Sequence, residues 1–103
     1  MTETAKRLMK ARGITVCECC GLRPAEEAHH CLYRRDNRDK KAGKVLNEDY
    51  NLQLVCKTCH EVKAKSFRNK QAFWYAQCQR YGRAVMLDWH ERLPYKVKEI
   101  AYN

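Results

Sequence analysis

The chain has 103 residues, of which 21 are Lys or Arg and 12 are Asp or Glu, giving a formal net charge of +9. This length predicts a single domain over residues 1–103, small enough to gain stability from a structural metal. Because no apolar run approaches the ~20 residues that span a bilayer and no secretory signal is present, we expect a cytoplasmic protein with reduced thiols and no membrane partner.

The first third of the chain predicts a helix and a strand. Residues 2–12 place basic and apolar side chains at helical spacing and stop at Gly13, which is typical of a short surface helix. Residues 26–33 predict a strand that contains His29 and His30. Because successive strand residues point to opposite faces, we expect these two imidazoles to diverge and to have different roles.

The middle of the chain predicts a loop, a second strand and a second helix. Residues 34–44 are polar and charged and include Gly43, which favours a loop or a hairpin tip. Residues 52–55 are an apolar run typical of a strand, and residues 57–67 predict a helix that carries His60.

The C-terminal part, about residues 70–102, predicts further helices. Apolar spacing places one over residues 71–81 and another over residues 84–93, the second stopped by Pro94. We expect their aromatic side chains to form core rather than a base-stacking platform, because stripes at helical spacing are usually buried. We interpret His90, in the second of these helices, as a surface residue.

Four of the seven cysteines form two C-x-x-C pairs. Two thiolates spaced in this way can bind one ion from a tight turn, and two such pairs complete a structural zinc site. The expected Zn²⁺ ligands are Cys17, Cys20, Cys56 and Cys59. Cys19 leaves a second choice of thiol in the first pair, but the C-x-x-C spacing favours Cys17 with Cys20. Residues 56–60 also match a c-type haem attachment pattern, although that chemistry belongs to exported proteins.

Basic side chains are concentrated in residues 34–44 and 57–70. Such clusters predict a phosphate-binding surface, with a merely solvated cationic face as the alternative. The candidate nucleic-acid contacts are Arg34, Arg35, Arg38, Lys40, Lys41, Lys63 and Lys65.

The ordered set of C-x-x-C, His-His, Asn and C-x-x-C-His within residues 17–65 resembles the zinc-ribbon form of the HNH endonuclease family, most closely its small free-standing bacterial and phage members. The resemblance implies an α+β fold with a ββα-metal, treble-clef-like core and flanking helices. It also implies a bacterial or phage-infected cytoplasm and a metal-dependent endonuclease acting on duplex DNA. By resemblance, His29 and His60 bind a catalytic divalent ion, His30 is the general base, and Asn51 braces the loop between the strands.

Elementary chemistry is consistent with these implied roles. A neutral imidazole, with an ordinary pKa of about 6.5, is a competent base at pH 7, and the expected products are 5′-phosphate and 3′-hydroxyl ends. Some family members have a third metal-binding His where this chain has Ala64, so we expect two protein ligands and open positions for the phosphate. Imidazole donors favour Mn²⁺, Co²⁺ or Ni²⁺ at least as well as Mg²⁺.

Two other functions fit parts of the same sequence. A non-catalytic zinc-ribbon protein that binds nucleic acid would use the cysteines and the basic flanks, but it would not need His29, His30 and His60. An accessory subunit of a phage packaging or restriction complex would gain activity only with its partner proteins. One active site cuts one strand, so double-strand cleavage would need a homodimer or two successive binding events.

Overall fold

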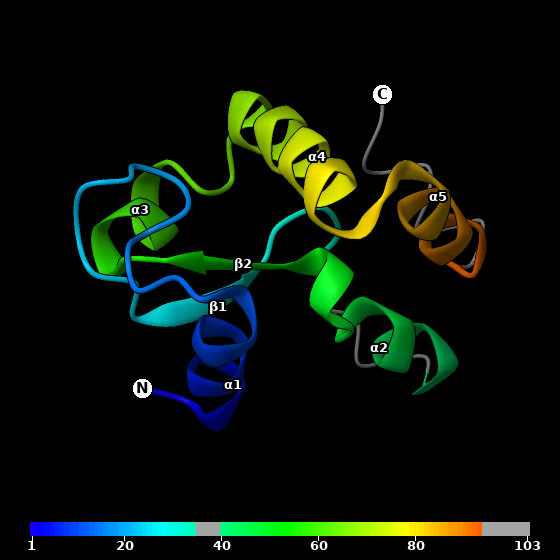
Figure 1. Ribbon diagram of the computed structural model, residues 1–103, viewed down its shortest axis with the longest axis horizontal. Coiled ribbons are helices and arrows are strands. Elements are labelled where there is room, and N and C mark those ends of the chain that lie inside the picture. The colour runs from blue at the N-terminus through cyan, green and yellow to red at the C-terminus, as the bar shows by residue number, and fades with distance from the viewer. Residues whose placement is uncertain (35–39, 94–103) are drawn as a thin grey trace.

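The computed structural model describes residues 1–34 and 40–93 and has an α+β architecture. In chain order its elements are α1 (Glu3–Arg12), β1 (Glu27–His30), α2 (Lys40–Leu46), the 3-10 helix η1 (Asp49–Asn51), β2 (Leu52–Val55), α3 (Lys57–Val62), α4 (Phe67–Tyr81) and α5 (Arg83–Glu91). Figure 1 shows the two-stranded sheet between α1 on one side and α3 and α4 on the other, with α2 and α5 beyond one end of it. None of the helices in these two ranges is long and apolar enough to cross a membrane.

The two strands pair antiparallel, with Glu27 opposite Val55 and His30 opposite Leu52. Paired residues share a face of the sheet, and successive residues alternate between faces. His30 therefore shares a face with Leu52, which packs in the cluster formed by α1, whereas His29 lies on the face toward α3. The strand register thus separates the two adjacent imidazoles, as alternation predicts.

Local signals set both ends of α1, the helix expected over residues 2–12. The Thr2 hydroxyl accepts a hydrogen bond from the Ala5 N–H at 3.1 Å, which caps the start. Gly13 ends the helix with a left-handed φ of 65°, a conformation that costs glycine little. Ala5 and Leu8 are buried against β2, so this helix covers one face of the sheet.

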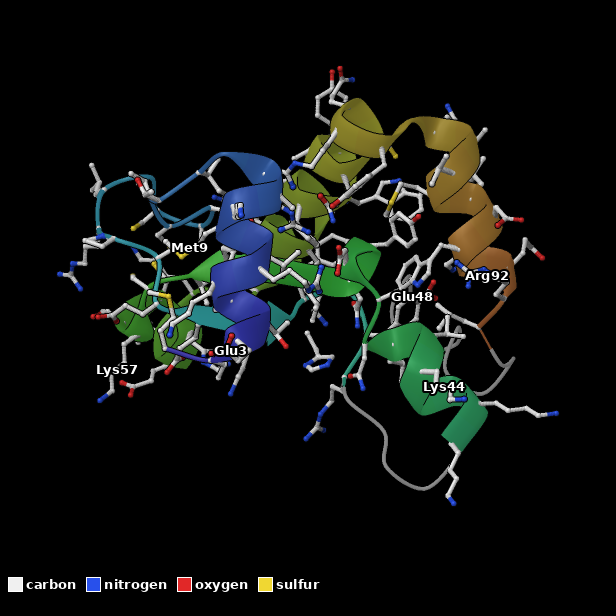
Figure 2. All side chains as sticks on the ribbon, turned by 60° about the horizontal axis from the view of Figure 1, so that its bottom comes forward. Glu3, Met9, Lys44, Glu48, Lys57 and Arg92 are labelled. Carbon is white, nitrogen blue, oxygen red and sulfur yellow. The ribbon has the colours of Figure 1, made fainter. Side chains whose placement is uncertain are left out.

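The largest apolar cluster joins α2, α4 and α5 to the segment that follows β1. Phe73 and Trp89 are buried in it, as expected, whereas Tyr75 on α4 is exposed, so the expectation that the aromatic side chains form core holds only in part. The indole N–H of Trp89 donates to the Val45 carbonyl of α2 at 3.0 Å. At the surface, Glu48 and Arg92 form an ion pair at 2.8 Å, and Figure 2 shows them meeting between the end of α2 and the end of α5.

The loop expected over residues 34–44 is wrong in its second part, where α2 forms. Ala42 and Leu46 lie four residues apart on this helix and are both buried in the large cluster. A buried leucine contributes ~2 kcal/mol, which outweighs the ~1 kcal/mol that Gly43 costs inside a helix. Residues 35–39 lie outside the described residues.

The helix expected over residues 57–67 is also wrong in length, because the structure divides it into α3 and the start of α4. The Ala64 N–H bonds back to the Cys59 carbonyl at 2.7 Å and closes the end of α3. The Ser66 hydroxyl then accepts from the Asn69 N–H at 3.1 Å and caps α4, which starts earlier than residue 71.

His90 is half-buried, not at the surface as the sequence suggested. Its Nε2 hydrogen-bonds with the Tyr33 hydroxyl at 2.5 Å, and its ring lies 6.2 Å from that of Trp74. Local sequence could not show this, because Tyr33 is far away along the chain. The expected helical structure over residues 94–102 falls outside the described residues.

Candidate functional site

The two cysteine pairs meet where the loop after α1 lies against the start of α3. The Sγ atoms of Cys17, Cys20, Cys56 and Cys59 all lie within 4.8 Å of one another. Tetrahedral zinc with Zn–S bonds of ~2.3 Å needs sulfur separations of ~3.8 Å, so a small contraction fits the cluster to the ion. In both pairs the first sulfur accepts the backbone N–H of the second cysteine at 3.4 Å. The four cysteines could therefore hold a structural metal such as zinc.

The environments of these thiols differ. Backbone hydrogen bonds from Arg23 and Leu22 lower the pKa of the Cys20 thiol to about 6, whereas burial raises the pKa of Cys59. Burial also raises the pKa of Cys19, which packs beside the cluster. Because thiolates and not thiols bind metal, a bound cation would supply the charge that keeps a buried group such as Cys59 deprotonated.

A buried ion pair fixes the first cysteine pair to the rest of the fold. The Glu18 carboxylate accepts hydrogen bonds from Arg12 and Arg80 at 2.8 Å each, and from the Leu54 N–H at 2.7 Å. The side chains of Arg12 and Glu18 are only 1% and 10% exposed, so the extra hydrogen bonds are needed to offset their desolvation. Through Glu18 the cysteine cluster is fixed relative to α1, β2 and α4.

Next to the cysteine cluster, three histidines line one open cleft of about 600 Å³. His29 and His30 come from β1, and His60 comes from α3, the helix that begins after Cys56. The ring centroids of His29 and His60 are 4.8 Å apart. The complete lining is Ala28, His29, His30, Cys31, Arg34, His60, Lys65 and Lys70. The fold thus places the rings of His29 and His60 side by side, and His30, on the other face of β1, lines the same cleft.

Two of these imidazoles are suited to binding a cation. His60 Nδ1 hydrogen-bonds with the Glu27 carboxylate, which fixes the ring and leaves Nε2 for a ligand. His29 Nε2 is buried and has no hydrogen-bond partner among the described residues. Burial, and next the neighbouring His60, lower the pKa of His29 to about 4, so its ring is neutral at pH 7. An unpartnered nitrogen beside a carboxylate-oriented imidazole fits a divalent ion with two protein ligands.

The third imidazole, His30, is held by a residue that the sequence did not single out. Its Nε2 lies 2.8 Å from Asn47 Oδ1. With this oxygen accepting, Nε2 carries the proton and Nδ1 keeps a lone pair, the arrangement that a general base needs. The sequence gives no local signal for Asn47, because its position depends on α2, which the polar composition of residues 34–44 does not predict. Glu27 could have been found, since it lies two residues before His29 and so on the same strand face.

Asn51 is fully buried and uses its whole side-chain amide to bind backbone. Its Oδ1 accepts from the N–H groups of Leu32 and Tyr33, and its Nδ2 donates to the carbonyls of Tyr33 and Leu46, all at 2.9 Å. These bonds tie the segment after β1 to the end of α2. Asn51 therefore fixes the two segments that flank His30 without entering the cleft itself.

Among the described residues, some of the basic candidates line the histidine cleft and the others lie elsewhere on the surface. Arg34 and Lys65 line the histidine cleft, together with Lys70, which the sequence analysis did not select. Lys63 lies at the end of α3 beside the exposed Leu22, away from the histidines. The exposed Lys40 and Lys41 lie in the first turn of α2. Arg35 and Arg38 lie outside the described residues.

Comparisons of the chain with protein-family models, with curated proteins and with solved structures found no match. The features that bear on function are therefore the cysteine cluster and the histidine cleft. Over residues 1–34 and 40–93, the four cysteines are the one group of three or more metal-ligating side chains that the fold gathers. The histidines add donors in a separate, open cleft with a basic lining.

Proposed function

We propose that this chain is a metal-dependent endonuclease of the HNH type, in which β1, β2 and α3 form a ββα-metal core. The observation that carries the proposal is the meeting of His29, His30 and His60 in one basic cleft beside the cysteine cluster. A protein that only binds nucleic acid would use the cysteines and the positive charge. It would have no need for three imidazoles on the lining of one cleft, one of them with a buried nitrogen that no described residue satisfies.

His29 and His60 would hold the catalytic divalent ion, His60 through the Nε2 that its bond to Glu27 leaves available. When bound, the ion supplies positive charge for the phosphate oxygens and for the departing 3′ oxygen. Glu27 fixes the orientation of the His60 ring and so the direction in which Nε2 faces. With two imidazole donors, we expect Mn²⁺, Co²⁺ or Ni²⁺ to support activity as well as Mg²⁺.

His30 would take the proton of the attacking water at Nδ1, because its Nε2 is occupied by Asn47. Asn51 keeps the end of β1 and the end of α2 in a fixed relation, so that His30 and Asn47 stay within hydrogen-bond reach. In-line attack by this water would leave a 5′-phosphate and a 3′-hydroxyl.

Duplex DNA is the substrate class that we propose. The cleft is open, and Arg34, Lys65 and Lys70 give its lining a positive charge that matches a phosphate backbone. A single cleft acts on one strand at a time. Nicking is therefore the expected activity of one chain, and double-strand cutting would need a homodimer or a second binding event.

Conversion of supercoiled plasmid to nicked circles tests the proposal, with zinc-loaded protein in Mg²⁺, Mn²⁺, Co²⁺ and Ni²⁺. The substitution His30→Ala should lower the cleavage rate by about 10²- to 10⁴-fold while leaving the zinc content and the DNA affinity unchanged. His90→Ala is the matched control, because it removes the one histidine that lies outside the cleft.

Two results would count against the proposal. Supercoiled DNA that stays intact in every metal, although the folded protein binds it, would leave a non-catalytic nucleic-acid-binding role. Equal cleavage by wild type and His30→Ala would show that the general base has been assigned to the wrong residue.

A further inference from the structure

The histidine cleft contains a lysine that comes from outside the segment carrying the cysteine and histidine motif. Lys70 lies on α4, downstream of residues 17–65, and lines the cleft with Arg34 and Lys65. No lining residue carries a carboxylate, and none of these three cations forms an ion pair with another described residue. Over the described residues, the lining of the cleft therefore carries three cations and no carboxylate, although Glu27 reaches His60 from β1.

Lys70 differs from the other two cations in its burial. Arg34 and Lys65 are exposed, whereas Lys70 is half-buried. It lies close to Cys31, whose pKa burial raises to about 12 against a smaller opposing effect of the Lys70 charge. Among the described residues no carboxylate lies within ion-pair distance of this partly buried ammonium, and a buried charge without a partner is unfavourable. An anion bound in the cleft would supply the missing charge.

Hydrogen bonds hold the start of α4, and with it the backbone of Lys70, in a fixed position. The Asn69 side-chain amide, one residue before Lys70, donates to the Ala64 carbonyl and to Gln53 Oε1 of β2, both at 2.8 Å. Ser66 caps the same turn. The first turn of α4 is thereby tied to the sheet and to the end of α3, which carries His60. A group held on such a supported element keeps its position relative to the site.

We propose that Lys70 binds a non-bridging oxygen of the scissile phosphate and so makes α4 part of the substrate site. This inference rests on the proposed endonuclease function. In the bound complex the Lys70 ammonium faces the phosphate from the α4 side, while His29 and His60 lie on the side of β1 and α3. Its charge then opposes the charge that develops on the phosphate oxygens during attack.

The experiment combines cleavage with DNA binding. Lys70→Met removes the charge and keeps most of the side-chain length, Lys70→Arg keeps the charge, and Lys10→Met removes an equal charge from the exposed face of α1. Plasmid nicking is measured for each single variant. Affinity for a short fluorescent duplex is measured over a salt series in the His30→Ala background, where cleavage does not interfere. Thermal unfolding and zinc content establish that each variant is folded.

We expect Lys70→Met to nick plasmid about 10- to 100-fold more slowly, the size of a lost charged hydrogen bond to phosphate, with Lys70→Arg recovering most of the rate. The slope of log affinity against log salt should fall by about 0.9, the value for one phosphate contact. If Lys70→Met and Lys10→Met lose activity and slope equally, Lys70 adds only general charge and the inference is wrong.

The design separates this failure from failure of the proposed function. If His30→Ala abolishes nicking but Lys70→Met nicks like Lys10→Met, the endonuclease proposal stands and the role of Lys70 falls. If wild type never nicks but Lys70→Met alone lowers the salt slope, Lys70 contacts a phosphate in a protein that only binds DNA, and the catalytic part of both proposals falls.

Discussion

The cysteine cluster and the histidine cleft lie side by side but are built in opposite ways. In the cluster, four sulfurs converge within 4.8 Å, and three of the four cysteines are buried. The cleft is open, and its rings come from two elements and include a nitrogen that no described residue satisfies. Closed sets of four ligands are typical of structural metals, and open positions are typical of sites that bind a substrate.

This difference indicates which region stabilises the fold and which performs chemistry. The cluster joins the loop after α1 to the start of α3, and Glu18 extends its hold to α1, β2 and α4. A change in the cluster should therefore unfold the chain. A change in the cleft should leave the fold intact, because a buried nitrogen without a partner costs stability rather than adding to it.

The largest effect is expected from Cys59→Ser, which removes one sulfur from the cluster. Structural zinc contributes several kcal/mol to folding, so we expect a loss of at least ~4 kcal/mol or of the cooperative transition altogether. Cys78→Ser is the matched control, because Cys78 is half-buried in the large apolar cluster and outside the metal set. Thermal unfolding and bound zinc are measured for both. Equal stability of the two variants would show that the cysteine cluster does not hold the fold together.

Asn51→Ala should have the next largest effect, since Asn51 is fully buried and lies in neither the cysteine cluster nor the lining of the histidine cleft. Its loss removes four buried hydrogen bonds to backbone, which costs ~2 to 4 kcal/mol. Asn47→Ala is the contrasting variant: this exposed residue holds His30, so stability should change by less than ~0.5 kcal/mol while nicking slows. Denaturant unfolding and plasmid nicking give both quantities. A large stability loss in Asn47→Ala would assign it a structural role.

The smallest effect is expected from Arg7→Met, at a contact remote from both sites. Arg7 makes two hydrogen bonds to the Asp49 carboxylate, at 2.9 and 2.7 Å, and the hydrogen bond lowers the pKa of Asp49. Arg7 is exposed and Asp49 is half-buried, so the pair is near the surface and its loss should cost about 0.5 kcal/mol. Because the folded pKa is depressed, this stability is fully present above the ordinary pKa of about 3.9 and is lost as pH falls through the folded value.

Melting temperatures of wild type and Arg7→Met should therefore differ at pH 7 and converge toward pH 2. A difference that stays constant over this range would mean that Arg7 acts by packing and not by charge. In either case zinc content and nicking should stay at wild-type values, since this contact lies outside both the cluster and the cleft.

Sequence predicted the parts of this arrangement that depend on local spacing. The C-x-x-C pairs define their own turn geometry, and alternation along a strand separates His29 from His30 whatever surrounds them. The contacts of Asn47 and Lys70 depend on where whole helices lie. Asn47 reaches His30 only because Leu46 buries α2, and Lys70 enters the cleft only because Ser66 starts α4 earlier than the apolar pattern suggested.

The cysteine cluster should stabilise the fold and the histidine cleft should carry out cleavage, each independently of the other. The substitution His29→Leu tests this most directly. Metal content, melting temperature and nicking rate are measured on one preparation of this variant and of wild type. We expect about one tightly held zinc per chain in both, an equal or higher melting temperature in the variant, and nicking at least ~100-fold slower. A variant that nicks normally, or one that loses its zinc and unfolds, would contradict the account.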